Sequence, residues 1–286
     1  MSERPVMIGA DRSLMGIVCE PDDPWPASRP AMIMLNAGLI HRVGPNRLHV
    51  RLARELAARG FLSLRLDLSG RGDSEPRRDG LSFAESGAVE AAEAMRYLED
   101  TKGVRRFVLF GICSGAAAAA EVAHVNERVA GAVVIEGGAY PTARFYRRYY
   151  ARRFFRARTW WNMITGANAT GRRLRRMLGR PAAPASAGGE MVSSMAIPES
   201  TKTAVAAALQ QMADRDVELL AVFSGSTKEY NYPGQLKEAF ATVNFRGHLE
   251  ESYYPQADHT FTRLGNQDVL VDRVLQWMQL KFEAAS

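Results

Sequence analysis

The sequence predicts an α/β protein in which a mostly parallel sheet is flanked by helices on both faces. Short apolar runs alternate along the chain with segments of helical periodicity, the pattern of strands joined by crossover helices. The chain has 286 residues, of which 47% are hydrophobic and 24% charged, so it is long enough to bury a sizeable core. We expect residues 1–136 and 199–286 to form this core, with an insert at 137–198.

The chain before the insert alternates strands with helices. The first two strands predict a hairpin, and the helix at 46–59 carries leucines at helical spacing and ends at Gly60. A strand at 107–111 leads directly into an alanine-rich helix at 114–125. The elements expected here are the strands 6–9, 14–19, 31–35, 61–68, 107–111 and 129–135, and the helices 46–59, 84–98 and 114–125.

The alternation resumes after the insert. Apolar runs at 218–223 and 249–254 predict two further strands, and amphipathic segments predict three helices at 201–213, 234–242 and 267–282. No internal repeat is present. The insert therefore interrupts one sheet and does not separate two domains.

The insert is strongly basic and is expected to form a helical lid. It contains twelve arginines between Gly137 and Gly189 and no lysine, aspartate or glutamate. Because the whole chain has a formal net charge of +6, the remainder carries −6. Aromatic residues at 145, 149, 150 and 154 fall near helical spacing, and the Pro/Ala/Gly-rich stretch 181–189 predicts a mobile loop.

Composition also excludes several classes of protein. The two cysteines, Cys19 and Cys113, are far apart and have no metal-ligand spacing, which argues against a disulfide framework, and we expect no metal and no cofactor. The N-terminus lacks the apolar centre of a signal peptide, and no run reaches the ~20 apolar residues of a membrane helix. We expect a cytoplasmic protein.

The most specific motif is Gly-x-Cys-x-Gly at 111–115, placed between the strand at 107–111 and the helix at 114–125. A strand that turns sharply into a helix holds the central residue in a strained conformation with its side chain outwards, and the flanking residues must be small. Cys113 also lies at a helix N-terminus, which favours the thiolate. We therefore predict Cys113 as a nucleophile; the alternative is a buried, inert cysteine.

The candidate general base is His259, in Pro255-Gln-Ala-Asp-His-Thr-Phe261. It follows the last predicted strand and precedes the final helix, which is the place of the histidine when nucleophile, acid and histidine follow in that order along the chain. The alternative is a histidine of an ordinary surface loop. His124 and His248 have no comparable context.

With these two motifs the sequence resembles the α/β-hydrolase superfamily over nearly the whole chain. Several stretches are also similar to the exosortase-A-system-associated hydrolases, a bacterial subgroup. They are His41-Arg-Val-Gly-Pro-x-Arg47, Tyr-Tyr-x-Arg-Arg at 149–153, Gly-x-Asn-x-x-Gly-x-x-Arg at 166–174 and Ala257-Asp-His-Thr-Phe261. The resemblance implies a Cys–His–acid triad in an α/β-hydrolase fold.

The acid of that triad departs from the family pattern. An aspartate is expected shortly after the strand at 218–223, but the loop contains none, and Glu229 is its nearest carboxylate. Glu136, at the end of the strand before the insert, is the competitor, because some members of the superfamily take their acid from there. We favour Glu229 over Glu136, and interpret Asp258 as a residue that shapes its own loop.

The oxyanion hole follows from the same geometry. One donor is the backbone N–H of Ser114, next to the nucleophile, and the other comes from the loop after the strand at 31–35, at Gly38 or Leu39. His41 and Arg42 project from that loop. They either contact the substrate or anchor the loop.

The arginines of the insert favour an anionic partner, because the insert holds no carboxylate to pair with them. Arg152, Arg153 and Arg156 are the candidate contacts. The partners considered are the phosphates of coenzyme A, an acidic acyl carrier protein and an anionic membrane surface. Binding of single-stranded nucleic acid is disfavoured, because no nucleic-acid-binding module is recognisable.

The sequence thus predicts an acyl-transfer hydrolase, either an esterase or thioesterase or an acyltransferase, that forms an acyl-Cys intermediate. An acyl-Cys is itself a thioester, so exchange with carrier thioesters is close to energetically neutral. The alternative, suggested by the irregular acid position, is a non-catalytic binding protein with a hydrolase fold that docks an anionic partner through its arginines.

Overall fold

The computed structural model describes all of the chain except residues 27, 82, 155–198 and 284–286. Its centre is an eight-stranded sheet with the order β1-β2-β4-β3-β5-β6-β7-β8. Strands β3 to β8 are mutually parallel, whereas β2 runs antiparallel to both β1 and β4. The strands are β1 Ser2–Ile8, β2 Leu14–Glu20, β3 Ala31–Met34, β4 Ser63–Leu66, β5 Phe107–Ile112, β6 Val129–Ile135, β7 Glu218–Ser224 and β8 Leu249–Tyr254.

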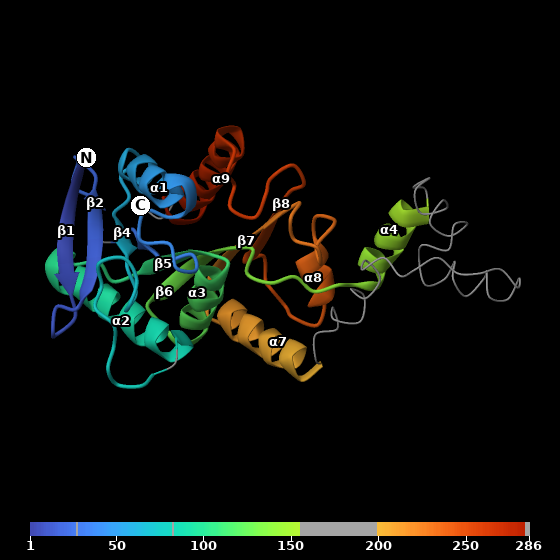
Figure 1. The fold of residues 1–286 in the computed structure, drawn as a ribbon, viewed down its shortest axis with the longest axis horizontal. Coiled ribbons are helices and arrows are strands. Elements are labelled where there is room, and N and C mark those ends of the chain that lie inside the picture. The colour runs from blue at the N-terminus through green and yellow to red at the C-terminus, as the bar shows by residue number, and fades with distance from the viewer. Residues whose placement is uncertain (27, 82, 155–198, 284–286) are drawn as a thin grey trace, which may run out of the picture.

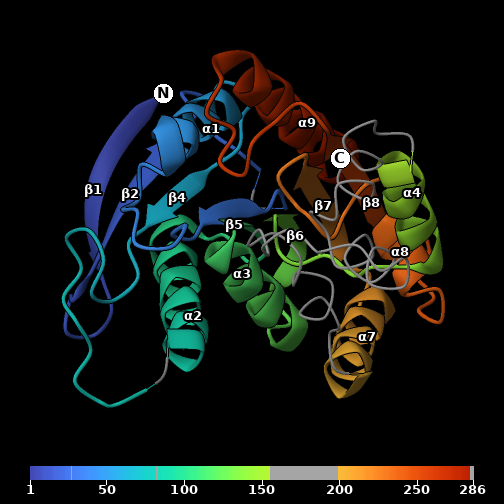
Figure 2. The same cartoon turned by 45° about the vertical axis from the view of Figure 1, so that its right-hand side comes forward.

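Helices cover both faces of this sheet (Figures 1 and 2). Helices α1 (Leu48–Ala57) and α9 (Leu264–Phe282) pack on one face, and α2 (Phe83–Lys102), α3 (Ser114–Val125) and α7 (Glu199–Asp214) pack on the other. The predicted architecture of a mostly parallel sheet between two helical layers is confirmed.

The alternation of side chains along each strand divides the core into two layers. In β3 the side chain of Met32 packs with α1 and α9, whereas that of Ile33 packs with α2 and α3. Successive residues of a strand point to opposite faces, so a strand buried on both sides is apolar throughout. This is why the central strands read as unbroken apolar runs.

The elements predicted from periodicity correspond closely to the observed ones. Helix α3 and strands β6 and β8 have the expected bounds, while the hairpin strand β1 begins earlier than expected and α8 (Gln235–Ala239) is shorter. The helix expected at 46–59 is a short 3-10 turn, Pro45–Arg47, followed by α1. The difference arises because Asn46 and Arg47 adopt positive φ and interrupt the helical geometry.

The described part of the insert, residues 137–154, contains one helix after a non-helical segment at 137–142. Helix α4 (Ala143–Phe154) carries the aromatic and arginine residues expected there, and it lies beside α8 at one end of the sheet (Figure 2). Arg156 and the stretch 181–189 lie outside the described residues, as do the side chains of Arg152 and Arg153. Among the helices that the structure describes, none is both long and apolar enough to span a membrane.

Candidate active site

Cys113 occupies the sharp turn between β5 and α3. Its backbone has φ 57° and ψ −116°, a region that non-glycine residues rarely occupy, and its N–H donates to the carbonyl of Ile135 at 2.9 Å. The thiol is exposed, whereas the thiol of Cys19 is buried. Strain of this kind is retained at functional sites because it holds a reactive side chain in place.

The two glycines of the motif are required by close backbone contacts. A Cβ on Gly111 would lie 2.0 Å from the carbonyl oxygen of Gly115, and a Cβ on Gly115 would lie 2.5 Å from that of Asn36. Contacts this short are not tolerated, and backbone atoms cannot move aside as a flexible side chain can. The spacing of the motif therefore reflects the packing of β5 and α3 against the loop after β3.

His259 and Glu136 form a polar pair at the carboxyl ends of the parallel strands. His259 lies in the loop after β8, and Glu136 directly follows β6. Nδ1 of His259 lies 3.2 Å from Oε2 of Glu136, which follows β6. The Glu136 side chain is 2% exposed and that of His259 is 48% exposed. When Nδ1 of a histidine donates to a carboxylate, Nε2 is the nitrogen that can accept a proton. The imidazole of His259 is open to solvent, whereas the carboxylate of Glu136 is buried.

Two donors from the end of β7 hold the Glu136 carboxylate. One oxygen accepts from the backbone N–H of Ser224, and the other accepts from the hydroxyl of Thr227. Glu136 itself has φ 57°, so it is a second residue in a strained conformation at this edge. The loop after β7, where an aspartate was expected, thus supplies hydrogen-bond donors to an acid carried by β6.

Glu229, the carboxylate preferred from the sequence, does not occupy the position beside His259. Among the described residues, no hydrogen bond joins the carboxylate of Glu229 to His259; the backbone carbonyl of Glu229 accepts from the side chain of Gln235. The adjacent residue, Tyr230, is buried and stacks on Phe223 with ring centroids 3.9 Å apart. This packing fixes the course of the loop, and the alternative acid, Glu136, is the one that contacts His259.

Asp258, the neighbour of His259 in sequence, shapes the loop as expected. Its Oδ1 accepts from the backbone N–H groups of Thr260 and Thr262 at 3.1 and 3.0 Å. These bonds lower the pKa of the Asp258 carboxyl below its ordinary value. The aspartate therefore orders the turn that presents His259.

The loop after β3 approaches the elbow through Ser114. The N–H of Gly38 donates to Oγ of Ser114 at 2.9 Å, so this predicted oxyanion donor already has a partner. Leu39 is 87% exposed, and His41 is also exposed. Ser114 therefore joins the two segments from which the oxyanion hole was predicted.

Arg42 is tied to the protein by ion pairs. Its guanidinium contacts the buried carboxylate of Asp67 and that of Asp73, the latter at 2.6 Å, and its backbone N–H also donates to Asp67. Asn36 joins the same network, since its amide donates to Asp67 at 3.1 Å. Of the two alternatives left open for Arg42, these contacts favour anchoring of the loop over contact with a substrate.

Two arginines of α4 lie against the ring of the buried Tyr232. The guanidinium carbon of Arg144 lies 4.6 Å from the ring centroid of Tyr232, and that of Arg148 lies 5.8 Å from it. Arg144, Arg147 and Arg148 are all exposed. Within the described part of the chain, no group of three or more histidines, cysteines or carboxylates is arranged to hold a metal ion.

Comparison with known proteins identifies the family. A family model described as the alpha/beta hydrolase fold matches residues 30–175, slightly more than half of the chain. The chain belongs to the α/β-hydrolase family. No match was found among curated proteins.

Solved structures of other proteins share the fold at low sequence identity. Est1E from Butyrivibrio proteoclasticus is 14% identical with a TM-score of 0.58, covering 98% of this chain and 99% of its own. Proline iminopeptidase from Mycobacterium smegmatis is 15% identical with a TM-score of 0.58, covering all of both chains. A thermophilic esterase from Thermogutta terrifontis is 16% identical with a TM-score of 0.53, covering 99% of this chain and 100% of its own.

Sequence reasoning missed the residues that support the site. Ser224 and Thr227 hold Glu136, and Asn36 and Asp67 hold the loop that carries Gly38. The one feature of the sequence that could have indicated their role is the absence of an aspartate after β7, because it shows that this loop does not supply the expected carboxylate. Nothing in the local sequence indicates that its polar groups point toward β6.

Proposed function

We propose that this α/β hydrolase transfers acyl groups from an ester or thioester through a thioester formed at Cys113. The single observation that carries the proposal is that Cys113, His259 and Glu136 all follow the carboxyl ends of parallel strands, on the same side of the sheet. There an exposed thiol at a strained elbow follows β5, and the His259–Glu136 pair is built from the ends of β6 and β8. A nucleophile, a base and a group that orients the base are the parts that covalent acyl transfer requires.

In the first step, Nε2 of His259 accepts the proton of the Cys113 thiol as Sγ bonds to the carbonyl carbon of the substrate. The π electrons of the carbonyl move to its oxygen, and Glu136 stabilises the imidazolium through Nδ1–H. When the tetrahedral intermediate collapses, the bond to the leaving oxygen or sulfur breaks. His259 returns the proton to that leaving group, and the acyl-Cys remains.

In the second step, His259 removes a proton from water or from another acceptor, which attacks the acyl-Cys carbonyl. The carbon–sulfur bond breaks, and Cys113 recovers its proton from His259. Because the acyl-Cys is a thioester, transfer from a thioester donor is close to energetically neutral. This favours thioesterase or acyltransferase activity beside simple ester hydrolysis.

The oxyanion is held at the junction of the elbow and the loop after β3. The backbone N–H of Ser114 is one donor, as its position at the start of α3 favours. The Ser114 hydroxyl accepts from the N–H of Gly38 and keeps its own proton for the oxyanion, so the side chain extends the reach of Gly38. The exposed N-terminal part of the loop, at Leu39 and His41, meets the incoming substrate.

The donor carries negative charge, either as phosphates of coenzyme A or as an acidic acyl carrier protein. The exposed arginines Arg144, Arg147 and Arg148 support this part of the proposal, because carboxylate partners for them are absent from 137–189. Solvated cations of this kind attract and orient an anionic donor without touching the reacting carbonyl.

Intact-mass measurement after incubation with a panel of acyl thioesters and activated esters tests the proposal. We expect one acyl group per chain, lost in Cys113→Ala and retained in Cys19→Ser. Iodoacetamide should label Cys113 well before Cys19 at neutral pH, because burial raises the pKa of the Cys19 thiol to about 11. Equal and slow labelling of both cysteines, with no acyl adduct, would instead indicate a non-catalytic protein that binds an anionic partner through α4.

A further inference from the structure

We propose that the cavity between α3 and α7 binds the acyl chain of the substrate and selects an unbranched, apolar chain of about eight carbons. This inference rests on the proposed acyl-transfer function and names its substrate class. The cavity has a volume of about 240 Å³. At roughly 30 Å³ for each water-sized group, this volume accommodates about eight methylene-sized units.

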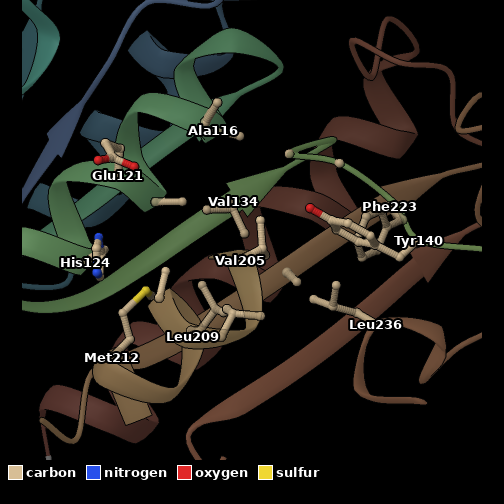
Figure 3. Close-up of a pocket in the computed structure, with 17 residues that line it drawn as sticks. Ala116, Glu121, His124, Val134, Tyr140, Val205, Leu209, Met212, Phe223 and Leu236 are labelled. Carbon is tan, nitrogen blue, oxygen red and sulfur yellow. The ribbon is translucent and has the colours of Figure 1, made fainter. Parts of the chain in front are cut away.

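The walls of the cavity are largely apolar and come from α3, α7, α8, β6 and β7 (Figure 3). Helix α3 contributes a row of small side chains, and α7 contributes aliphatic side chains that face them. Strands β6 and β7 lie beneath, through Val134, Ala221 and Phe223. The apolar helical residues of the lining include Ala116, Ala117, Ala120, Val205, Ala208 and Leu209.

One end of the cavity adjoins the proposed nucleophile and acid. Ala116 and Ala117 line the cavity in the first turn of α3, and their N–H groups donate to the backbone carbonyl of Cys113 at 3.1 and 3.3 Å. Gly137, the residue after Glu136, also lines it, and a Cβ built on Gly137 would lie 3.1 Å from that of Ala116. The cavity thus begins one helical turn after Cys113, and in this proposal the acyl chain of a substrate bonded to Cys113 enters it at that end.

The opposite end of the cavity is polar. Glu121 and His124 lie there on the last turns of α3, and Nε2 of His124 is hydrogen-bonded to Gln211 of α7. From Ala116 to His124 the helix rises about 12 Å at 1.5 Å per residue. Polar side chains at this distance limit the chain length, because a longer apolar chain would meet groups that lose their hydration without gaining a partner.

The small residues of α7 permit a sharp test. Ala208 lines the cavity, whereas its neighbour Ala207 is exposed and does not line it. We expect Ala208→Phe to fill part of the cavity, and Ala207→Phe to serve as a matched control on the same helix. Leu209→Ala should enlarge the cavity, so it is a second variant whose effect on chain length is opposite to that of Ala208→Phe.

The measurement is kcat/KM for saturated acyl-CoA thioesters of two to twelve carbons. In the native protein we expect a rise of about fourfold per methylene, up to about eight carbons and a decline beyond, from the transfer free energy of a methylene group. Ala208→Phe should move the optimum to shorter chains, and Leu209→Ala should move it to longer ones. Ala207→Phe should keep the native profile. A chain-length profile that is identical in all four proteins overturns the proposal.

Binding of octanoate to the Cys113→Ala protein, measured by calorimetry, separates this inference from the proposed function. Octanoate should bind, bind much more weakly when Ala208→Phe is added, and bind as before when Ala207→Phe is added. Binding with this pattern but without turnover in the native protein would overturn the proposed function and support the cavity. Turnover without any chain-length dependence, and without octanoate binding, would support the function and overturn the cavity.

Discussion

Glu136 and His259 are 123 residues apart in the chain, yet Oε2 of the first lies 3.2 Å from Nδ1 of the second. The carboxylate is buried and is held from two sides by Ser224 and Thr227, so it has a fixed position before any substrate arrives. A base oriented by a preorganised carboxylate loses little conformational freedom during the reaction. The end of β7 and the loop after it therefore supply donors to the carboxylate that contacts His259.

Replacement of Glu136 tests this assignment of the acid. Glu136→Gln should lower kcat by on the order of 10- to 10⁴-fold with little change in stability, because the amide no longer stabilises the imidazolium. Glu229→Gln is the matched control and should leave kcat within about twofold of the native value, since its carboxylate does not contact His259. The measurement is kcat on an activated ester for both variants. A large loss in Glu229→Gln alone would contradict the assignment, and no loss in either would indicate a Cys–His dyad.

The hydroxyl of Ser114 has a separable role. Ser114→Ala should lower kcat by about 10- to 10³-fold while the backbone N–H of residue 114 remains, because the oxyanion loses the donor that Gly38 polarises. Ser114→Thr should recover part of the activity, since it restores a hydroxyl. Steady-state kinetics on an ester and on the matching thioester provide the comparison. Native or higher activity in Ser114→Ala would show that Gly38 donates directly and that the hydroxyl only occupies its N–H in the free protein.

His49 should make the fold sensitive to acid. The imidazole is fully buried beneath the loop after β3, edge-on to Phe110, and among the described residues neither ring nitrogen has a partner. Burial lowers its pKa to about 3. The unfolded chain takes up a proton near the ordinary value of 6.5 and the folded chain does not, so stability is full above about pH 6.5 and falls as the pH drops toward 3.

The expected slope is up to about 1.4 kcal/mol per pH unit in the free energy of unfolding. His49→Leu should remove this contribution, whereas His41→Leu, at an exposed histidine, should keep it. Urea unfolding between pH 7 and pH 4.5 measures the slope in all three proteins. The same slope in the native protein and in His49→Leu would assign the acid sensitivity to other groups.

The exposed arginines of α4 should act on charged donors alone. Arg147→Glu should raise KM for an acyl-CoA donor and leave kcat/KM for a neutral p-nitrophenyl ester unchanged, because the attraction acts between solvated charges. High salt should reproduce the effect, since screening reaches ~8 Å at physiological ionic strength. Arg105→Glu, an exposed arginine at the opposite edge of the sheet, is the control. If kcat/KM for the two substrates changes equally with salt, the arginines of α4 do not recognise the donor. Attachment to an anionic membrane surface is then the preferred explanation for their charge.

The sequence by itself was sufficient to predict the architecture and the elbow. Apolar periodicity located each strand and helix, because a strand buried on both faces must be apolar throughout and a helix on a sheet must be apolar along one stripe. The two glycines around Cys113 indicated the turn, since the contacts that exclude a Cβ arise within 111–115 and at its nearest neighbour, the loop after β3. The periodicity and the Gly111–Gly115 contact are local in sequence or repeat along it, whereas the contact of Gly115 with Asn36 appears only in the folded chain.

Tertiary structure decided which side chains meet. The choice between Glu136 and Glu229 depends on the course of the loop after β7, which is fixed by the stacking of Tyr230 on Phe223 and by the contact of Thr227 with Glu136. The anchoring of Arg42 likewise depends on Asp67, 25 residues away. The cavity exists only where α7 packs near α3. Local spacing cannot specify such contacts, because each depends on the relative position of segments that the sheet brings together from distant parts of the chain.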